Sequence, residues 1–300
     1  MTDCAATSPA KSNFEFLRTE ILEHRPIAKD TWKLTVAAPH LAQVTQPGQF
    51  YMVRIAECND PLIGRALAFY DRGLDASGKP DSVSVVYVVK GKFTRALSSR
   101  VAGQSVELWG PLGNTFSAEA VDHLILVAGG VGITPMLTLA TSALGLESYG
   151  ASNSSVEGSV EGSPTGAFAK RVTLCYGART KEYLAGLDAF SDRGVHLEIA
   201  TEDGSLGTRG RVTEPLERLL RARTGSVRIA CCGPEPMMQA VGKVASNYEV
   251  PCEVSLETPM ACGIGICFTC VAKIQQEDGS WDYRRTCMEG PVFASQQVVW

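Results

Sequence analysis

The chain contains 300 residues, enough for two ordinary domains and a small module, and its 45% hydrophobic and 20% charged residues are typical of a globular protein. The formal net charge is -4 and there is no polybasic run, which argues against nucleic acid or an anionic membrane as a partner. Ten cysteines accompany a polar N-terminus that lacks the apolar core of a signal peptide, so we expect a reducing, cytoplasmic location.

The first part of the chain is predicted to be rich in β-strands. Residues 14–38 have the composition of strands joined by a short polar connection, and residues 82–90 and 104–110 alternate apolar with polar side chains. Turns are predicted at two Gly/Pro sequences, PGQF (47–50) and GPLG (110–113). Many short strands with such punctuation favour a small antiparallel β-barrel, which we assign to residues 13–118.

The next segment, residues 119–250, alternates apolar runs with helix-like segments. The apolar runs suit strands buried on both faces of a parallel sheet: LILVA (124–128), RVTLCYGA (171–178), VHLEIATED (195–203) and VRIACCG (227–233). The helix-like segments are residues 135–147, 181–193, 212–224 and 234–247. This order predicts a doubly wound parallel α/β domain.

Two stretches of this domain differ from the rest in composition. Residues 124–146 contain no charged residue and are long enough to span a bilayer, but GGVGITP at their centre favours a strand, a turn and a new helix. Residues 148–169 are rich in Gly and Ser and are predicted to form a flexible surface insertion. The repeated VEGS within them indicates low complexity rather than a structural repeat.

The strongest chemical signal is a group of four cysteines in a small C-terminal module, residues 251–300. Cys262, Cys267 and Cys270 have the spacing C-x4-C-x2-C, and sixteen residues separate Cys270 from Cys287. This spacing matches the plant-type [2Fe-2S] arrangement, in which four thiolates hold two irons. We therefore predict an iron–sulfur cluster at these four residues.

Two glycines in the same loop, Gly263 and Gly265, allow the backbone to wrap around a cluster and bring N–H groups near the sulfurs. A structural zinc site is an alternative, although zinc ligands are usually spaced in close pairs and only one clear C-x-x-C pair exists. A disulfide is a second alternative, which the absence of a secretory signal disfavours. The remaining cysteines match no site and are assigned to core or surface positions: Cys4, Cys58, Cys175, Cys231 and Cys252.

GGVGITP (129–135) is a candidate dinucleotide-binding turn. It follows an apolar strand and precedes an apolar helix, so Gly129, Gly130 and Gly132 would let the backbone approach a pyrophosphate at the helix N-terminus. Pro135 occupies the place of the third glycine of the usual G-x-G-x-x-G pattern and suits a first helical turn. Alone the motif is weak, because a structural tight turn produces the same pattern.

A second turn strengthens this prediction. Cys232, Gly233 and Pro234 follow another predicted strand and precede a helix, which places them at the carboxyl edge of the same sheet. Ligands bind at that edge in open α/β folds. The following Met237 and Met238 have the pattern of core residues, and a buried core cysteine is the alternative for Cys232.

Together these motifs resemble a known family. The order PGQF, Arg65, GPLG, GGVGITP, YGAR, CCGPEPMM and C-x4-C-x2-C…C, over residues 14–298, is similar to that of the electron-transfer subunits of class 1B dihydroorotate dehydrogenase. That family belongs to the ferredoxin–NADP reductase superfamily. The segment SLETPMACGIGICFTCVAKI…RRTCMEGPVF is its most distinctive part. The resemblance implies an FAD-binding barrel, an NAD(H)-binding domain and a terminal [2Fe-2S] module.

The resemblance also implies roles for single residues. FAD would contact Arg65, Ala66, Leu67, Ala68, Gly91 and Thr94. The nicotinamide dinucleotide would contact Gly129, Gly130, Gly132, Gly233 and Pro234, with Thr134 near its ring and Cys232 over the flavin–nicotinamide stack as catalytic residues. A solvated arginine is the alternative for Arg65, and a helix cap for Thr94.

One segment departs from the family pattern, which usually has Arg-Pro-aliphatic-Ser at the flavin arginine. Here the string is Arg65-Ala66-Leu67-Ala68, so the aliphatic residue is kept and the hydroxyl is lost. The usual hydrogen bond from that hydroxyl to the flavin ring is therefore in doubt. Its loss could shift the flavin potential or change how the ring is held.

The combined signals predict electron transfer from one carrier to the next: nicotinamide, FAD, cluster and an external partner. The four histidines, at positions 24, 40, 123 and 196, are scattered, and no group suited to a small organic substrate is evident. By resemblance, the partner is an FMN-containing dihydroorotate dehydrogenase catalytic subunit, in a heterotetramer with two copies of each chain. The alternatives are an NAD(P)H-dependent reductase subunit for ferredoxin, sulfite reductase or hydrogenase, and a non-enzymatic zinc-binding scaffold.

Overall fold

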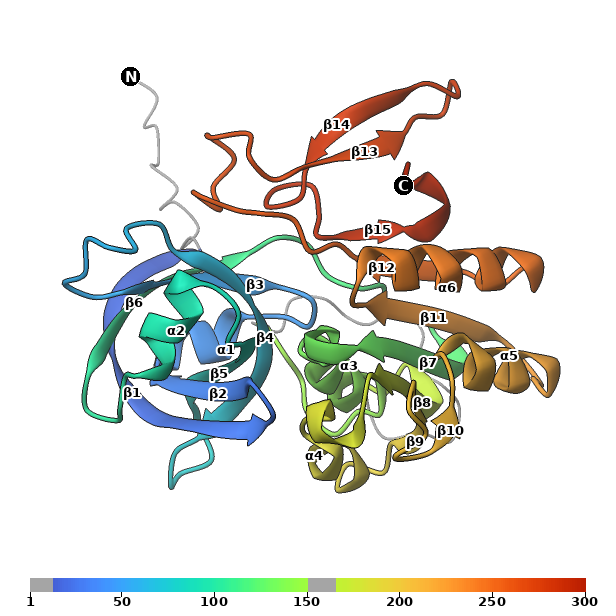
Figure 1. The fold of residues 1–300 in the computed structure, drawn as a ribbon, viewed down its shortest axis with the longest axis horizontal. Helices are drawn as coiled ribbons and strands as arrows, with labels where there is room; N and C mark the ends of the chain where they lie inside the picture. Colours follow the sequence, from blue (N-terminus) through green and yellow to red (C-terminus); the bar gives the residue numbers. More distant parts are fainter. Residues whose placement is uncertain (1–12, 151–165) are drawn as a thin grey trace, which may run out of the picture.

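The computed structural model describes residues 13–150 and 166–300, and Figure 1 shows a barrel beside a sheet with a C-terminal segment above both. Six antiparallel strands close the barrel in the order β1-β2-β5-β4-β3-β6, which confirms the predicted barrel. The strands are β1 (Glu15–Ala28), β2 (Thr31–Ala37), β3 (Phe50–Ile55), β4 (Arg65–Leu74), β5 (Pro80–Val88) and β6 (Ser105–Leu112). Two short helices accompany them, α1 (Pro39–Val44) and α2 (Lys92–Ser98).

The predicted turn at 110–113 is replaced by a bulge, because β6 continues to Leu112. Opposite β3, Met52 pairs with Trp109 and Phe50 pairs with Leu112, so β6 has one extra residue between the two pairs. An extra residue shifts the side-chain alternation by one position. Trp109 and Leu112 therefore lie on the same outer face of the barrel.

The second part is a seven-stranded sheet in the order β10-β9-β8-β7-β11-β12-β15, parallel except for β15 at the edge. Its strands are β7 (Val121–Gly129), β8 (Ala169–Ala178), β9 (His196–Thr201), β10 (Thr208–Arg209), β11 (Val227–Cys232), β12 (Cys252–Ser255) and β15 (Val292–Ala294). The connecting helices are η1 (Gly130–Ile133), α3 (Met136–Ala143), η2 (Lys181–Tyr183), α4 (Leu187–Ser191), α5 (Thr213–Arg221) and α6 (Glu235–Asn247).

Helices cover both faces of this sheet, as the doubly wound prediction requires (Figure 1). Met136 and Leu137 of α3 and Phe190 of α4 join one apolar cluster, whereas Leu216 of α5 and Val241 of α6 join another. Such covering explains why the parallel strands are almost continuously apolar.

The predicted helix over residues 181–193 is wrong in one respect, since it is divided into η2 and α4. Gly186 separates them in a left-handed conformation, with φ +67°. A Cβ atom at this position would lie 2.4 Å from the hydroxyl oxygen of Tyr70 in the barrel, so both the conformation and the close contact require glycine at the break.

The uncharged stretch at 124–146 forms β7, η1 and the α3 helix, as predicted. Among the described residues, no helix has the length and apolar character needed to cross a membrane. Most of the predicted flexible insertion, residues 148–169, lies outside the described residues. Its described ends are packed: Tyr149 contacts Phe69 with ring centroids 5.9 Å apart, and Phe168 is buried.

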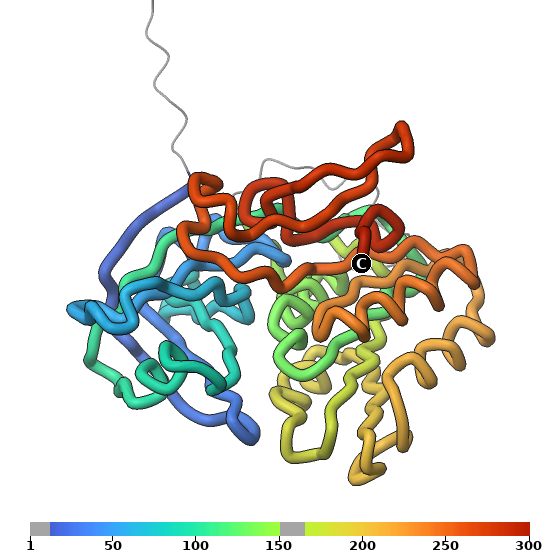
Figure 2. Tube along the Cα trace, turned by 45° about the horizontal axis from the view of Figure 1, so that its top comes forward, coloured from blue at the N-terminus to red at the C-terminus, as the bar shows by residue number. Residues whose placement is uncertain are grey.

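The C-terminal segment lies across the barrel and the sheet (Figure 2). Its hairpin consists of β13 (Val271–Gln275) and β14 (Trp281–Arg285), and η3 (Ser295–Gln297) follows β15. Two strands of this segment, β12 and β15, complete the parallel sheet. The division of the chain at residues 118 and 250 remains a prediction.

Candidate functional site

Two glycine turns lie side by side at the carboxyl edge of the parallel sheet, because β7 and β11 are neighbouring strands. A Cβ atom at Gly132 would lie 2.2 Å from the carbonyl oxygen of Cys232, and one at Gly129 would lie 2.5 Å from the sulfur of Met237. Gly130, with φ +54°, faces open space instead. The first two glycines thus permit the turns to pack, and the third leaves room beside them.

Cys232 and Thr134, the predicted nicotinamide contacts, both lie at this edge and are buried. Burial raises the pKa of the Cys232 thiol well above its ordinary range, and the Glu257 carboxylate adds to the effect. Cys232 is therefore a neutral thiol at physiological pH. The Thr134 hydroxyl donates a 2.9 Å hydrogen bond to the carbonyl of Val131. Two buried, uncharged side chains at this edge suit the positioning of a nicotinamide ring.

Glu257 is a residue of this edge that the sequence analysis missed. It follows β12, whose Ser255 pairs with Cys232 of β11. Glu257 is accessible to solvent, yet surrounding protein atoms raise the pKa of its carboxyl group, and the positive charge of Lys90 opposes that rise. Its electrostatic partners thus come from the sheet and from the barrel. The carboxyl group is therefore close enough to both Cys232 and Lys90 to interact with them electrostatically.

The predicted flavin segment begins β4. Leu67 points into the barrel core, whereas Ala66 and Ala68 lie half-buried on the opposite face and Arg65 is exposed. The Arg65 guanidinium donates to the backbone carbonyls of the two preceding residues, at 3.2 and 2.9 Å. The outer face of the strand therefore carries two small side chains, whereas Arg65 starts the strand on the same side as Leu67.

The turn before α2 lies next to this strand, since the Arg65 guanidinium is 5.7 Å from the centre of the Phe93 ring. Gly91 is the N-cap of α2. The Thr94 hydroxyl accepts hydrogen bonds from the backbone N–H groups of Lys90 and Gly91, at 2.9 and 3.0 Å, so Thr94 does cap the helix. The structure brings the predicted FAD contacts together, and their contact with FAD itself remains a prediction.

The four predicted ligand cysteines lie close to one another: Cys267 interacts with Cys262, and Cys287 interacts with both Cys270 and Cys262. Hydrogen bonds with Thr269 and Cys262 lower the pKa of the exposed Cys267 thiol to about 6. Cys267 is therefore largely a thiolate at neutral pH, the form that binds metal. Burial and the neighbouring Cys270 raise the pKa of the Cys287 thiol to about 12.

This group of four cysteines suits a two-iron cluster, because four thiolates hold two irons. In residues 13–150 and 166–300, no three His, Cys, Asp or Glu side chains are placed to hold one ion. The loop backbone has positive φ at Gly263, Gly265 and Phe268, with values of 74°, 77° and 56°. These left-handed residues bend the chain around the sulfurs, as expected for the two glycines.

Strand β4 connects the flavin segment with the cysteines and with the α/β domain. Ala66 packs against the small apolar cluster that contains Cys270 and Cys287. Two ion pairs, each 3.0 Å long, join the same strand to the α/β domain: Asp71–Arg193 and Arg72–Glu147. Strand β4 therefore contacts both the apolar cluster that contains two of the four thiols and the α/β domain.

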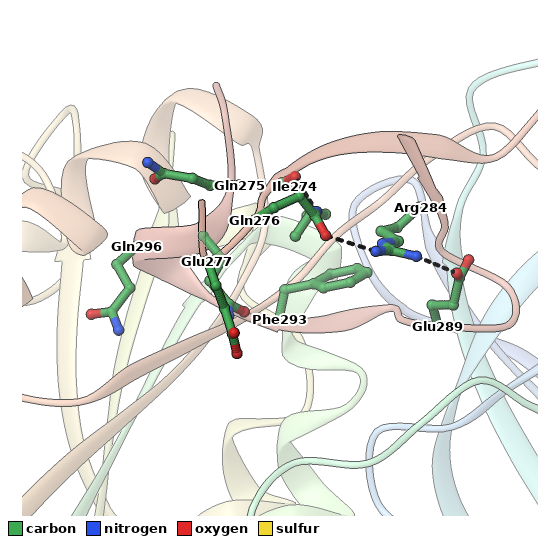
Figure 3. A pocket seen from close by; sticks show the side chains of 9 residues that line it. Ile274, Gln275, Gln276, Glu277, Arg284, Glu289, Phe293 and Gln296 are labelled. Atoms are coloured by element: carbon green, nitrogen blue, oxygen red, sulfur yellow. Dashed lines mark hydrogen bonds and ion pairs between the residues drawn. The ribbon is translucent and has the colours of Figure 1, made fainter. Parts of the chain in front are cut away.

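The remaining cysteines match the core or surface assignment, except that Cys4 lies outside the described residues. Cys175, Cys231 and Cys252 are buried, and Cys58 is half-buried. A separate groove of about 510 Å³ lies between the β13–β14 hairpin and η3 (Figure 3). None of the predicted site residues lines it.

Comparison with protein families gives two matches along the chain. Residues 257–299 match the iron–sulfur cluster binding domain of dihydroorotate dehydrogenase B, and residues 126–243 match an oxidoreductase NAD-binding domain. The chain thus carries a cluster-binding domain and an NAD-binding domain, at the cysteine loop and at the glycine turns.

Among solved structures, an NADH-dependent reduced ferredoxin–NADP oxidoreductase is similar with a TM-score of 0.74 and 28% identity, over 94% of this chain and 90% of that one. Phthalate dioxygenase reductase has the same fold, with a TM-score of 0.59 and 17% identity over 93% of this chain and 95% of its own.

Curated relatives match almost the whole chain. The electron transfer subunit of dihydroorotate dehydrogenase B (NAD(+)) from Desulforamulus reducens is 33% identical over 91% of this chain and 94% of its own length. The same subunit from Bacillus caldolyticus is 34% identical over 94% of this chain and 98% of its own. The chain therefore belongs to the family of electron transfer subunits of dihydroorotate dehydrogenase B.

Proposed function

We propose that this chain transfers electrons between NAD(H) and a catalytic partner subunit, through FAD and a [2Fe-2S] cluster, during the oxidation of dihydroorotate to orotate in pyrimidine biosynthesis. The observation that carries the proposal is the contact of Ala66, in the flavin segment, with the apolar cluster around Cys270 and Cys287. Bound FAD supplies the link, because a flavin exchanges two electrons with a nicotinamide and single electrons with a cluster.

The chain's own residues bind and orient the carriers. Arg65 provides the positive charge for the FAD phosphates, and the half-buried Ala66 and Ala68 allow the ring to lie against β4. Without a hydroxyl at position 68, the ring receives no hydrogen bond from this side chain. Gly91 and Thr94 contribute the turn at which the pyrophosphate is held.

At the sheet edge, Gly129, Gly130, Gly132, Gly233 and Pro234 form the turns that accept the dinucleotide. Cys232 and Thr134 hold the nicotinamide against the flavin, and both remain neutral. Glu257 contributes a carboxyl group near Cys232, where it orients the nicotinamide. The thiolates of Cys262, Cys267, Cys270 and Cys287 hold the cluster.

We further propose that the partner is the FMN-containing dihydroorotate dehydrogenase, in a heterotetramer with two copies of each chain. Family membership supports this choice, and so does the name of the relatives, which are electron transfer subunits. We place the complex in the cytoplasm, where thiols remain reduced. The likeness to an NADH-dependent ferredoxin–NADP oxidoreductase favours ferredoxin as the second candidate acceptor.

The purified protein is expected to be yellow-brown, with one FAD, about two irons and acid-labile sulfide per chain, because it has one flavin site and four cluster ligands. Anaerobic purification followed by flavin, iron, zinc and sulfide assays measures this. Zinc in place of iron, without labile sulfide, would contradict the cluster assignment. Protein with a cluster but no flavin would contradict the role of the barrel.

Replacing Cys232 with alanine is expected to slow the reduction of bound flavin by NADH roughly 10- to 100-fold while FAD content stays unchanged, since a positioning contact is lost. Stopped-flow absorbance measures the rate. The matched control is Cys231→Ala, which removes a buried thiol from the opposite face of the same strand. Equal rates for the wild-type protein and Cys232→Ala would mean that Cys232 serves only in packing.

A further inference from the structure

The end of β6 and the turn that follows it contact both segments that carry the cluster ligands. The indole N–H of Trp109 donates a 3.0 Å hydrogen bond to the backbone carbonyl of Cys262, the first ligand. The two residues are 153 positions apart in sequence. The ring of Phe16 lies 5.8 Å from the Trp109 ring on the neighbouring strand, which restricts the indole. A barrel side chain thus holds the start of the ligand loop.

The bulge in β6 places an apolar surface beneath the loop that begins at Cys262. Because of the extra residue, Leu112 lies on the outer face with Met52 of β3, in the cluster that includes Cys270 and Cys287. A Cβ atom at Gly263 would lie 2.6 Å from Met52 and 2.9 Å from Leu112. The loop therefore rests directly on the barrel, with no space for another layer of side chains.

Asn114 holds the second ligand segment, just beyond Cys287. Its side-chain amide donates to the carbonyls of Glu289 and Val292, at 3.3 and 2.8 Å. Its side-chain oxygen accepts from the N–H of Val292 at 2.9 Å, and its own N–H donates to the carbonyl of Gly290 at 2.6 Å. The side chain thus replaces a strand partner for residues 289–292.

Residues 289–292 are also connected to the β13–β14 hairpin, on the side away from Asn114. The backbone N–H of Arg285 donates to the Glu289 carboxylate at 2.7 Å, and Arg284 links that carboxylate to Gln276 of the hairpin (Figure 3). The Arg285 guanidinium also donates to the carbonyl of Gly265 at 3.2 Å. These bonds fix the two ligand segments to each other, whereas Trp109 and Asn114 fix them to the barrel.

We propose that Trp109 and Asn114 are positioning residues that seat both halves of the cluster site on the barrel and so set the placement of the cluster relative to the flavin. Strand β3 lies between β4, the flavin strand, and β6. Flavin and cluster are therefore held on one rigid sheet. The inference rests on the proposed function, since it requires that FAD and the cluster both bind.

The test uses the full-length holoprotein with Trp109→Phe, which keeps an aromatic ring but loses the N–H donor, and Asn114→Ala, which loses the side-chain bonds. Trp32→Phe is the control, because Trp32 is in β2, which neighbours neither β3 nor β6. Three quantities are measured: iron release to a chelator, the EPR spectrum of the dithionite-reduced cluster, and its midpoint potential. FAD content and flavin reduction by NADH are measured in the same samples.

Trp109→Phe is expected to release iron about fivefold faster than the wild-type protein, the effect of one lost hydrogen bond on opening of the loop. Asn114→Ala loses three side-chain hydrogen bonds and is expected to release iron faster still. Both are also expected to change the EPR spectrum and the midpoint potential of the cluster. FAD content and flavin reduction should stay unchanged, and Trp32→Phe should match the wild-type protein throughout.

Two results would overturn the inference: wild-type iron release and EPR spectra in both variants, or an equal change in Trp32→Phe. A second pair, Trp109→His and Asn114→Gln, which retain a ring N–H and a side-chain amide, serves if the first pair does not fold. In these variants, which keep part of the hydrogen bonding, an EPR spectrum that differs slightly from the wild-type spectrum supports the inference. A spectrum identical to that of the wild-type protein in both variants, together with wild-type iron release, contradicts it. A wild-type protein without labile sulfide would instead disprove the proposed function.

Discussion

Replacing Cys267 with serine is expected to lower the iron content from about two atoms per chain to near none and to remove the labile sulfide. Cys267 is exposed, and its thiol has a pKa of about 6, so it provides a ready thiolate that a serine hydroxyl does not replace. Most FAD should remain bound, because the predicted flavin contacts lie in β4 and α2 of the barrel.

Activity measurements on this variant distinguish the step from NADH to the flavin from the step through the cluster to the partner. The Cys267→Ser variant should still reduce artificial dyes with NADH, whereas electron transfer to the partner should fall to background. Cys58→Ser is the matched control, since Cys58 is a half-buried thiol outside the ligand loop. A full complement of iron and sulfide in Cys267→Ser would show that the cluster has other ligands.

The second large effect is expected at Gly132, where alanine would place its Cβ atom 2.2 Å from the carbonyl oxygen of Cys232 and 2.4 Å from the carbonyl carbon. Both atoms belong to the backbone of a buried strand end, so neither can move without disturbing the sheet edge. We expect a cost of about 2–4 kcal/mol and a thermal midpoint lower by roughly 5–10 °C.

Gly130→Ala provides the comparison within the same turn. Its Cβ atom would meet no atom within 4 Å, so only the positive φ of 54° opposes the substitution. The expected cost is about 1 kcal/mol. Thermal unfolding of both variants without added nucleotide measures the difference. Equal midpoints would mean that the two glycine turns are not tightly packed against each other.

The parts of the fold that follow from local pattern could be predicted from the sequence. Apolar runs such as 124–128 and 227–233 indicated parallel strands, and the four cysteine positions indicated the cluster loop. Both signals depend on residues close together in the chain. The parallel sheet agrees with the first signal, and the match of residues 257–299 to an iron–sulfur cluster binding domain agrees with the second.

Features that depend on distant contacts could not be predicted in this way. The sequence GPLG resembles a turn, but pairing of β6 with β3 continues the strand through a bulge. The helix over 181–193 is divided at Gly186, where the close approach of Tyr70 from the barrel leaves no room for a side chain. Glu257 lies in the SLETPMACG segment, but nothing in that segment indicates its neighbours, and only the pairing of β12 with β11 brings it near Cys232.

Reconstitution with the FMN-containing catalytic subunit tests the central claim most directly. Alone, this chain should reduce artificial dyes with NADH and show no oxidation of dihydroorotate, because the dihydroorotate site is assigned to the partner. Adding the partner should produce a stable complex with dihydroorotate:NAD activity, and Cys267→Ser should abolish that activity. If the intact partner neither binds this chain nor gains NAD-linked activity, the assignment to dihydroorotate oxidation is contradicted.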